Sequence, residues 1–202
     1  MPLEIEAKFL NVDINDIRSK LQAAGGKLEH PMRIMRREHF DYPDERYQHA
    51  SGGTNERLRI RDEGDKVTAT YKRSSPDSTY DVDITITVDS YESTKQLLTA
   101  IGLQSFNYQE TKRETWMLDD TEVVIDEWPW AAPYVEIEGK SEEDVKAVAA
   151  KLGFEWTSAQ YGSADTVYAA QYPKWATGDS IGFVPVVKFN TPLPDYLKER
   201  MR

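Results

Sequence analysis

Residues 3–8 read LEIEAK, and residues 135–140 repeat the pattern as VEIEGK. In an extended strand, side chains two positions apart point to the same face. Each copy therefore places two carboxylates and one lysine on one face and apolar side chains on the other. An exposed strand that covers a core would show the same alternation, which is the commoner meaning of such a pattern. The repeat predicts two equivalent acidic strands.

A helical pattern that ends at a glycine follows each copy. Asp13 precedes an apolar stripe of helical spacing that ends at Gly25, and Ser141 precedes a similar stripe that ends at Gly153. The two strand–helix–glycine units indicate an internal duplication. A third helix is predicted at about 91–101.

A basic strand lies between the two acidic copies. Residues 57–61 read RLRIR, which places Arg57, Arg59 and Arg61 on one face. If all three strands belong to one closed sheet with charged faces inward, its interior holds cations and carboxylates together. A site for a polyphosphate with a divalent metal requires this combination.

Further alternating runs between polar turn signals bring the predicted number of strands to about eight. The predicted strands cover about 3–9, 34–42, 56–63, 66–73, 80–88, 106–117, 121–128 and 133–139. Residues 43–55 are predicted as a loop, and 158–172 as a helix. The proline-rich tail 173–202 is expected to pack on the same domain. Its run 184–189 could add a strand or pack across the end of the closed sheet, and 196–202 could form a short helix.

Composition excludes several classes of protein. The formal net charge of −10 argues against a general nucleic-acid binder, because phosphate-backbone affinity needs clustered cations in excess. The absence of cysteine is compatible with a reducing compartment, and the three histidines lack zinc-ligand spacing. No apolar run approaches the ~18 residues that a membrane span needs. We therefore expect a cytoplasmic protein with neither a nucleic-acid nor a membrane partner.

Several motifs, in the right order, resemble those of the CYTH family. These are the triphosphate tunnel enzymes, which include adenylyl cyclases of the smaller bacterial type, thiamine triphosphatases and inorganic triphosphatases. The similar segments are EIEAK at 4–8 (the family's ExExK signature), LRIR at 58–61, TYK at 70–72, RETW at 113–116, VIDEW at 124–128 and YVEIEG at 134–139. The resemblance covers residues 3 to about 172.

The resemblance implies an α+β fold, a closed eight-stranded antiparallel β-barrel with helices packed outside. Its tunnel would bind a triphosphate with Mg²⁺ or Mn²⁺. One tunnel domain would cover residues 1–172, with 173–202 as a C-terminal extension. The predicted substrate-binding residues are Lys8, Arg57, Arg59, Arg61, Lys72 and Arg113. The predicted metal ligands are Glu4, Glu6, Asp126, Glu136 and Glu138, and the predicted catalytic residues are Glu4, Glu6, Lys8 and Lys72.

The residue types agree with this chemistry. Arginine forks suit paired phosphate oxygens, and carboxylates suit magnesium. In-line transfer at phosphorus is mostly positioning and charge stabilisation, so it needs no Ser/His/Asp nucleophile.

The chain departs from the family pattern at three threonines. Family members commonly carry an acidic pair on the strand after the Lys72 strand. If Thr85 and Thr87 occupy these places and do not face outward, the tunnel lacks carboxylates on one wall; Asp83 is a candidate substitute. Relatives carry a lysine where this chain has Thr111, and the adjacent Lys112 belongs to the opposite face unless a bulge intervenes. These departures leave the substrate class open.

Other basic and aromatic residues are expected to have structural roles. Arg33, Arg36 and Arg37 could extend the basic lining, although an external basic face is the expected role. Packing is the expected role of Trp116, Trp128 and Trp130, although stacking on a base or thiazole ring stays open.

The leading hypothesis is metal-dependent hydrolysis of inorganic triphosphate, a nucleoside triphosphate or thiamine triphosphate by a monomer or homodimer. In one alternative the chain is an adenylyl cyclase, in which the ribose 3′-hydroxyl attacks the α-phosphorus of ATP and pyrophosphate leaves. In another it binds polyphosphate or nucleotide without catalysis. The sequence shows no adenine-binding motif that would decide among them.

Overall fold

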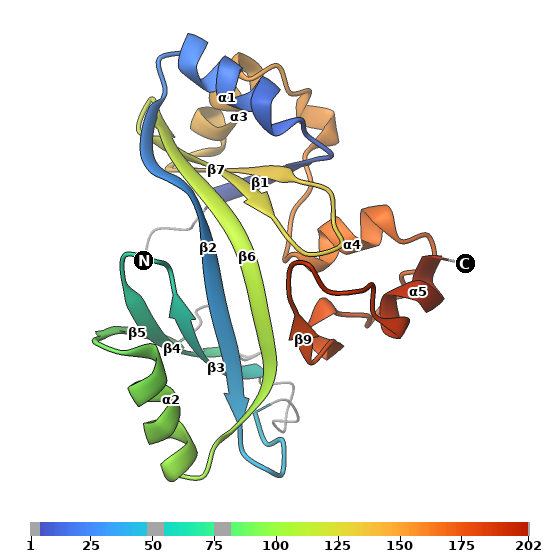
Figure 1. The fold of residues 1–202 in the computed structure, drawn as a ribbon. Helices are drawn as coiled ribbons and strands as arrows, with labels where there is room; N and C mark the ends of the chain where they lie inside the picture. Colours follow the sequence, from blue (N-terminus) through green and yellow to red (C-terminus); the bar gives the residue numbers. More distant parts are fainter. Residues whose placement is uncertain (1–4, 48–54, 75–81, 202) are drawn as a thin grey trace. The chain divides into compact units, whose positions relative to one another are not determined.

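The computed structural model describes residues 5–47, 55–74 and 82–201. Within these residues the chain forms nine strands and five α-helices (Figure 1). The strands are β1 (Ile5–Leu10), β2 (Lys27–Asp41), β3 (Asn55–Asp62), β4 (Val67–Ser74), β5 (Val82–Val88), β6 (Gln104–Leu118), β7 (Thr121–Glu127), β8 (Tyr134–Gly139) and β9 (Val186–Val187). The helices are α1 (Ile14–Ala23), α2 (Tyr91–Ala100), α3 (Glu142–Lys151), α4 (Asp165–Gln171) and α5 (Asp195–Met201).

The strands form one sheet in the order β1-β8-β7-β6-β2-β3-β4-β5, and β9 pairs with β6 in parallel. This confirms an α+β fold with an antiparallel sheet. The expected closed barrel needs correction, because the pairings of the described strands leave β1 and β5 as the two ends of the order. Each of these two strands has one partner, β8 for β1 and β4 for β5, so hydrogen bonds do not close the described sheet.

The chain divides into two compact units. Unit 1 comprises Met1–Arg33, Thr111–Ile181 and Phe189–Arg202, and unit 2 comprises Ile34–Glu110 and Gly182–Lys188. The C-terminal tail therefore supplies a short segment, which contains β9, to unit 2.

Unit 1 contains both predicted strand–helix–glycine units. Asp13 caps α1 by accepting hydrogen bonds from the backbone N–H groups of the first turn, and Ser141 caps α3 in the same way. Gly25 and Gly153 follow the helices with φ of 84° and 79°, a conformation that glycine adopts without strain. The apolar stripes of both helices share one core with the apolar faces of β1, β7 and β8.

Unit 2 has its own smaller core. Phe40 of β2, Ile60 of β3 and Tyr91 of α2 are buried together with Leu103. Helix α2 begins at the cap residue Ser90 and packs on β3. Helix α2 thus covers this face of the sheet at β3, and the arginines of β3 lie on the other face.

Several predicted boundaries differ from the structure. Strand β2 begins seven residues earlier than expected, although its first half contains Pro31, a residue that argues against a central strand. The helix predicted over 158–172 is wrong in its first half, where a 3₁₀ turn (Trp156–Ser158) precedes Gly162 with φ of 101°. Only α4 remains, because that backbone angle interrupts a right-handed helix. In the tail, β9 and α5 confirm the predicted strand and helix.

In the part of the chain that the structure describes, no helix has both the length and the apolar character that crossing a bilayer would require.

Candidate functional site

The two acidic strands are neighbours in unit 1, and their charged residues share a face. Strands β1 and β8 pair so that Glu6 lies opposite Glu138 and Lys8 opposite Glu136. Directly opposite residues of antiparallel strands point to the same side. The intervening Ala7 is fully buried in the core on the other side. We call Glu6, Asp126, Glu136 and Glu138 the acidic set.

Lys8 lies within the acidic set and neutralises two of its members. Its Nζ is 2.7 Å from Glu6 Oε1 and 3.0 Å from Glu136 Oε2, and its side chain is only 4% exposed. Burial alone would lower the pKa of Lys8, but Glu136 and Glu6 outweigh it and raise the pKa. Lys8 therefore carries its charge in this buried position.

Arg113 makes a similar pair with Asp126 across β6 and β7. Its Nε and one terminal nitrogen donate to the two oxygens of Asp126 at 2.8 and 2.6 Å, and Tyr134 Oη donates to the same carboxylate at 3.1 Å. Burial opposes the charge of Arg113, but Asp126 and Glu136 raise its pKa. For Glu136, burial raises the pKa, and the nearby Lys8 and Arg113 offset this only in part.

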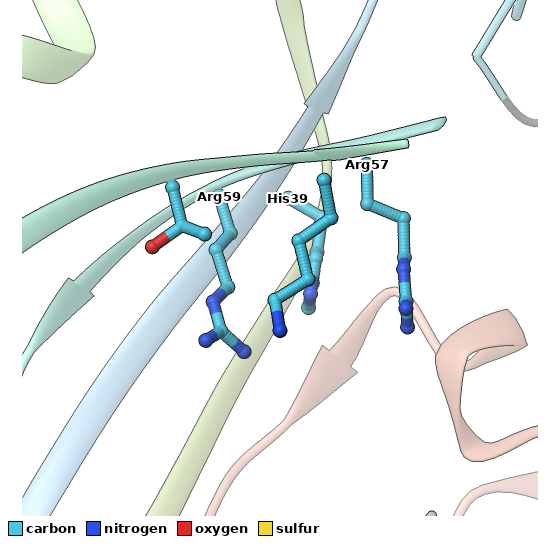
Figure 2. Close-up of a pocket in the computed structure, with 5 residues that line it drawn as sticks. His39, Arg57 and Arg59 are labelled. Atoms are coloured by element: carbon cyan, nitrogen blue, oxygen red, sulfur yellow. The ribbon is translucent and has the colours of Figure 1, made fainter. Parts of the chain in front are cut away.

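A second charged site, in unit 2, is a pocket lined by His39, Arg57, Arg59, Thr70 and Lys72. We call it the basic pocket. The strand register explains why these side chains meet, because His39 of β2 lies opposite Arg59 of β3, and Arg57 and Arg59 lie opposite Lys72 and Thr70 of β4. Figure 2 shows His39, Arg57 and Arg59 extending from one side of these strands. Three cationic side chains thus surround one small space.

Threonines replace the expected acidic pair beside this pocket. Thr85 Oγ1 is 3.0 Å from Thr70 Oγ1, and Thr87 lies opposite Thr68, which in turn lies opposite Arg61. Both threonines therefore share the face of the arginines and do not face away from it. Asp83 lies opposite Lys72 in the register, and its side chain is outside the part that the structure describes.

The sequence-predicted site residues fall into two groups. Glu6, Lys8, Arg113, Asp126, Glu136 and Glu138 belong to unit 1, whereas Arg57, Arg59, Arg61 and Lys72 belong to unit 2. Arg61 shares the face of the basic pocket without lining it. Glu4 lies outside the described residues.

The donors of the acidic set fit a hard divalent cation, because carboxylates are the ligands that Mg²⁺ and Mn²⁺ prefer. Glu6 and Glu136 meet through Lys8, and Glu138 lies opposite Glu6 in the register. Among the described residues, however, no three acidic or histidine side chains converge closely enough to enclose a metal as they stand.

Three residues of these two faces were not predicted from the sequence, and a fourth, Arg37, was assigned mainly to an external face. His39 lines the basic pocket, and Arg37, expected on an external face, lies opposite Arg61. Their alternation along β2 was the available signal. Glu122 lies opposite Glu138, and Tyr134 donates to Asp126. Neither pairing could be inferred without the register of β7 and β8.

Arg36 and two tryptophans have the structural roles that were expected of them. Arg36 binds Asp62 with an Nε–Oδ2 distance of 3.1 Å and stacks on Tyr91, away from the basic pocket. The buried Trp116 and Trp128 donate their indole N–H groups to Glu114 and Tyr134. Both tryptophans therefore pack inside unit 1.

A CYTH domain model matches residues 2–168. The chain belongs to the CYTH family. No curated protein sequence matches it significantly.

Solved structures share the fold at low sequence identity. The PH1012 protein from Pyrococcus horikoshii OT3 is 19% identical, with a TM-score of 0.60 over 82% of this chain and 99% of that one. A Vibrio parahaemolyticus protein described as a candidate adenylate cyclase is 12% identical, with a TM-score of 0.63 over 82% and 97% of the two chains. A Hippeastrum protein, described as a candidate adenylyl cyclase with a dominant triphosphatase activity, is 15% identical, with a TM-score of 0.54 over 84% and 96%.

Proposed function

We propose that this chain is a metal-dependent triphosphatase that binds its substrate through the basic pocket. The observation that carries the proposal is the convergence of Arg57, Arg59 and Lys72 on one small pocket, in a chain whose formal net charge is −10. Cations gathered against such a balance point to an anionic ligand. A triphosphate carries about four negative charges. These match the three cations of the basic pocket together with Arg61, which lies on the same face.

The lining residues supply two kinds of contact. Arg57 and Arg59 offer planar N–H forks that suit pairs of phosphate oxygens, and Lys72 offers a compact charge. The Thr70 hydroxyl, which lies 3.0 Å from Thr85 Oγ1, would offer one further polar contact. Together these side chains would hold the triphosphate still and stabilise charge as it moves onto the leaving group.

The acidic set is the proposed metal site. Glu6, Glu136 and Glu138 would hold Mg²⁺ or Mn²⁺, and Lys8 and Arg113 would limit their mutual repulsion. When bound, a divalent cation stabilises charge on the transferring phosphoryl group and activates water. Arg113 holds Asp126 in place, so Asp126 would act by orienting its neighbours.

Family membership and the reported triphosphatase activity of the Hippeastrum protein support hydrolysis as the reaction class. The substrate is proposed as a class: inorganic triphosphate, a nucleoside triphosphate or thiamine triphosphate.

A product assay tests the proposal. The purified chain is incubated with Mg²⁺ or Mn²⁺ and, separately, with tripolyphosphate, ATP or thiamine triphosphate, and the products are separated by ion-exchange chromatography. We expect release of orthophosphate that stops with EDTA. Cyclic AMP with pyrophosphate from ATP would instead identify a cyclase, and binding without any product would identify a non-catalytic binder.

A further inference from the structure

His39 is held in one protonation form by a chain of hydrogen bonds in unit 2. Asn107 Nδ2 donates to the backbone carbonyl oxygens of Gly182 at 3.1 Å and Val184 at 2.7 Å. Because carbonyl oxygens only accept, the amide nitrogen must face them, and Asn107 Oδ1 must face His39. His39 Nδ1 lies 3.2 Å from that oxygen, so Nδ1 carries the hydrogen.

The other ring nitrogen, Nε2, is therefore the free acceptor of a neutral imidazole. Burial lowers the pKa of His39 to about 3, Arg37, Arg59 and Arg57 add to the effect, and the hydrogen bond to Asn107 opposes it. The ring is therefore neutral at physiological pH although it lines the basic pocket. An acceptor nitrogen and an ionised phosphate oxygen cannot form a hydrogen bond unless a proton lies between them.

We propose that binding of a polyphosphate in the basic pocket is coupled to the uptake of one proton by His39 Nε2. The imidazolium then donates Nε2–H to a phosphate oxygen, and Nδ1–H stays on Asn107. The proton comes from solvent, and no covalent bond of the ligand changes. This inference rests on the proposed triphosphate site and adds a further binding residue to it.

The charges around the ring explain why the ligand triggers the uptake. Arg37 acts from the same strand, Arg57 and Arg59 act from β3, and Lys72 acts from β4. From β6 the ring meets Asn107, which does not titrate. A polyphosphate neutralises these cations and adds negative charge beside the ring, and both changes favour the imidazolium.

The C-terminal tail positions this residue. Gly182 and Val184 lie beyond the residues matched by the family model, which ends at 168. Their carbonyl oxygens orient Asn107, and Asn107 selects which nitrogen of His39 faces a ligand. The tail thereby contributes to the pocket without lining it.

Calorimetry of tripolyphosphate binding to the full chain in EDTA tests the proposal. Titrations at pH 6.5 in buffers of different ionisation enthalpy give the number of protons taken up. His39→Gln is the matched variant, because its amide can donate near the position of Nε2 but cannot titrate. His39→Asn is the second variant, because its amide can keep the hydrogen bond to Asn107 while lacking Nε2.

The wild type should take up close to one proton more than either variant, which subtracts any protonation of the ligand itself. Its affinity relative to His39→Gln should fall by up to about tenfold per pH unit as the pH rises through the pKa of bound His39. Imidazole ¹⁵N shifts of the wild type should show Nε2 unprotonated in the free chain and protonated with tripolyphosphate.

Equal proton uptake in wild type and His39→Gln would overturn this inference and leave the triphosphate site intact. An Nε2 that stays unprotonated in the complex would do the same, even if the variants fail to fold. Absence of tripolyphosphate binding to the wild type would overturn both the inference and the proposed function.

Discussion

At the scale of single residues, the acidic set depends on two buried cations. Lys8 bridges Glu6 and Glu136, and Arg113 holds both oxygens of Asp126. Carboxylates gathered this closely repel one another, and burial raises the cost of keeping them charged. Lys8 and Arg113 lower the electrostatic cost of this carboxylate cluster before any metal binds.

Lys8→Met tests this compensation. Breaking a buried ion pair leaves an uncompensated charge, so we expect a loss of about 3 kcal/mol of unfolding free energy at pH 7. The raised pKa of Lys8 keeps the wild-type lysine charged at this pH and below. The stability that the charged lysine contributes is therefore fully present below the ordinary pKa of lysine. It would be lost only when the pH rises through the raised pKa of Lys8.

The pH dependence of the variant comes from Glu136. Its pKa is raised, so its carboxyl becomes neutral as the pH falls, and the cost of the unpaired charge disappears. Urea unfolding at pH 7 and pH 5 measures the difference. A penalty that is equally large at both pH values would show that lost packing, and not lost charge, is responsible.

Glu138→Gln tests the metal assignment, because it keeps the shape of the side chain and removes its charge. We expect turnover with Mg²⁺ to fall about a hundredfold, because changing the groups that only support metal ligands already costs about 10- to 100-fold. Glu127→Gln is the control, as Glu127 lies opposite Lys112 on the other face of the same sheet. Steady-state kinetics at saturating tripolyphosphate would refute the assignment if the two variants were equally active.

At the scale of elements, strand register decides which charges meet. His39, Arg59, Thr70 and Thr85 lie in one row across β2 to β5, with one residue from each strand. A shift of one residue in any pairing would turn that strand's member to the opposite face. The row ends in a threonine where a carboxylate was expected, so the local field of this face stays positive.

Thr87→Glu tests the effect of that missing carboxylate. The new charge would lie on the face of Arg61, so we expect metal-free tripolyphosphate affinity to drop about fivefold and metal-dependent turnover to rise. Ile86→Glu is the control, because it adds the same charge on the exposed opposite face, where effects stay within about 0.5 kcal/mol. Calorimetry in EDTA would exclude the idea if both variants bound as the wild type does.

The sequence predicted these elements where the signal is local. Alternation identified the acidic and basic strands, and cap residues with terminal glycines identified α1 and α3. The start of β2 was missed because Pro31 weakens the pattern there, and Gly162 broke a helix that the apolar spacing favoured. Strand closure was an implication of the family resemblance and is not reproduced by the described hydrogen bonds.

The sequence predicted the charged residues of the candidate site but not its neutral histidine. Arg57 and Arg59 were predicted from alternation and Lys72 from the family resemblance, and the structure gathers them in one pocket. His39 alternates with Arg37 along β2, but its role could not be predicted, because it depends on Asn107 and on backbone carbonyls far along the chain. Contacts of this kind depend on the tertiary fold and have no sequence period.

At the scale of the whole molecule, the two compact units separate the two kinds of charge. Unit 1 holds the acidic set, and unit 2 holds the basic pocket. The C-terminal tail belongs mainly to unit 1, yet it adds β9 and two carbonyl acceptors to unit 2. We therefore propose that unit 2 binds the triphosphate and that unit 1 binds the metal.

The affinity of tripolyphosphate for the metal-free chain tests this account most directly, with Arg59→Ala as the variant and Arg36→Ala as the control. Arg59 lines the basic pocket, whereas Arg36 binds Asp62 and Tyr91 on the other face. We predict that Arg59→Ala weakens binding by about 1.5–3 kcal/mol, the usual value for a charge-assisted contact, and that Arg36→Ala leaves it unchanged. Equal affinities of wild type and Arg59→Ala would contradict the account.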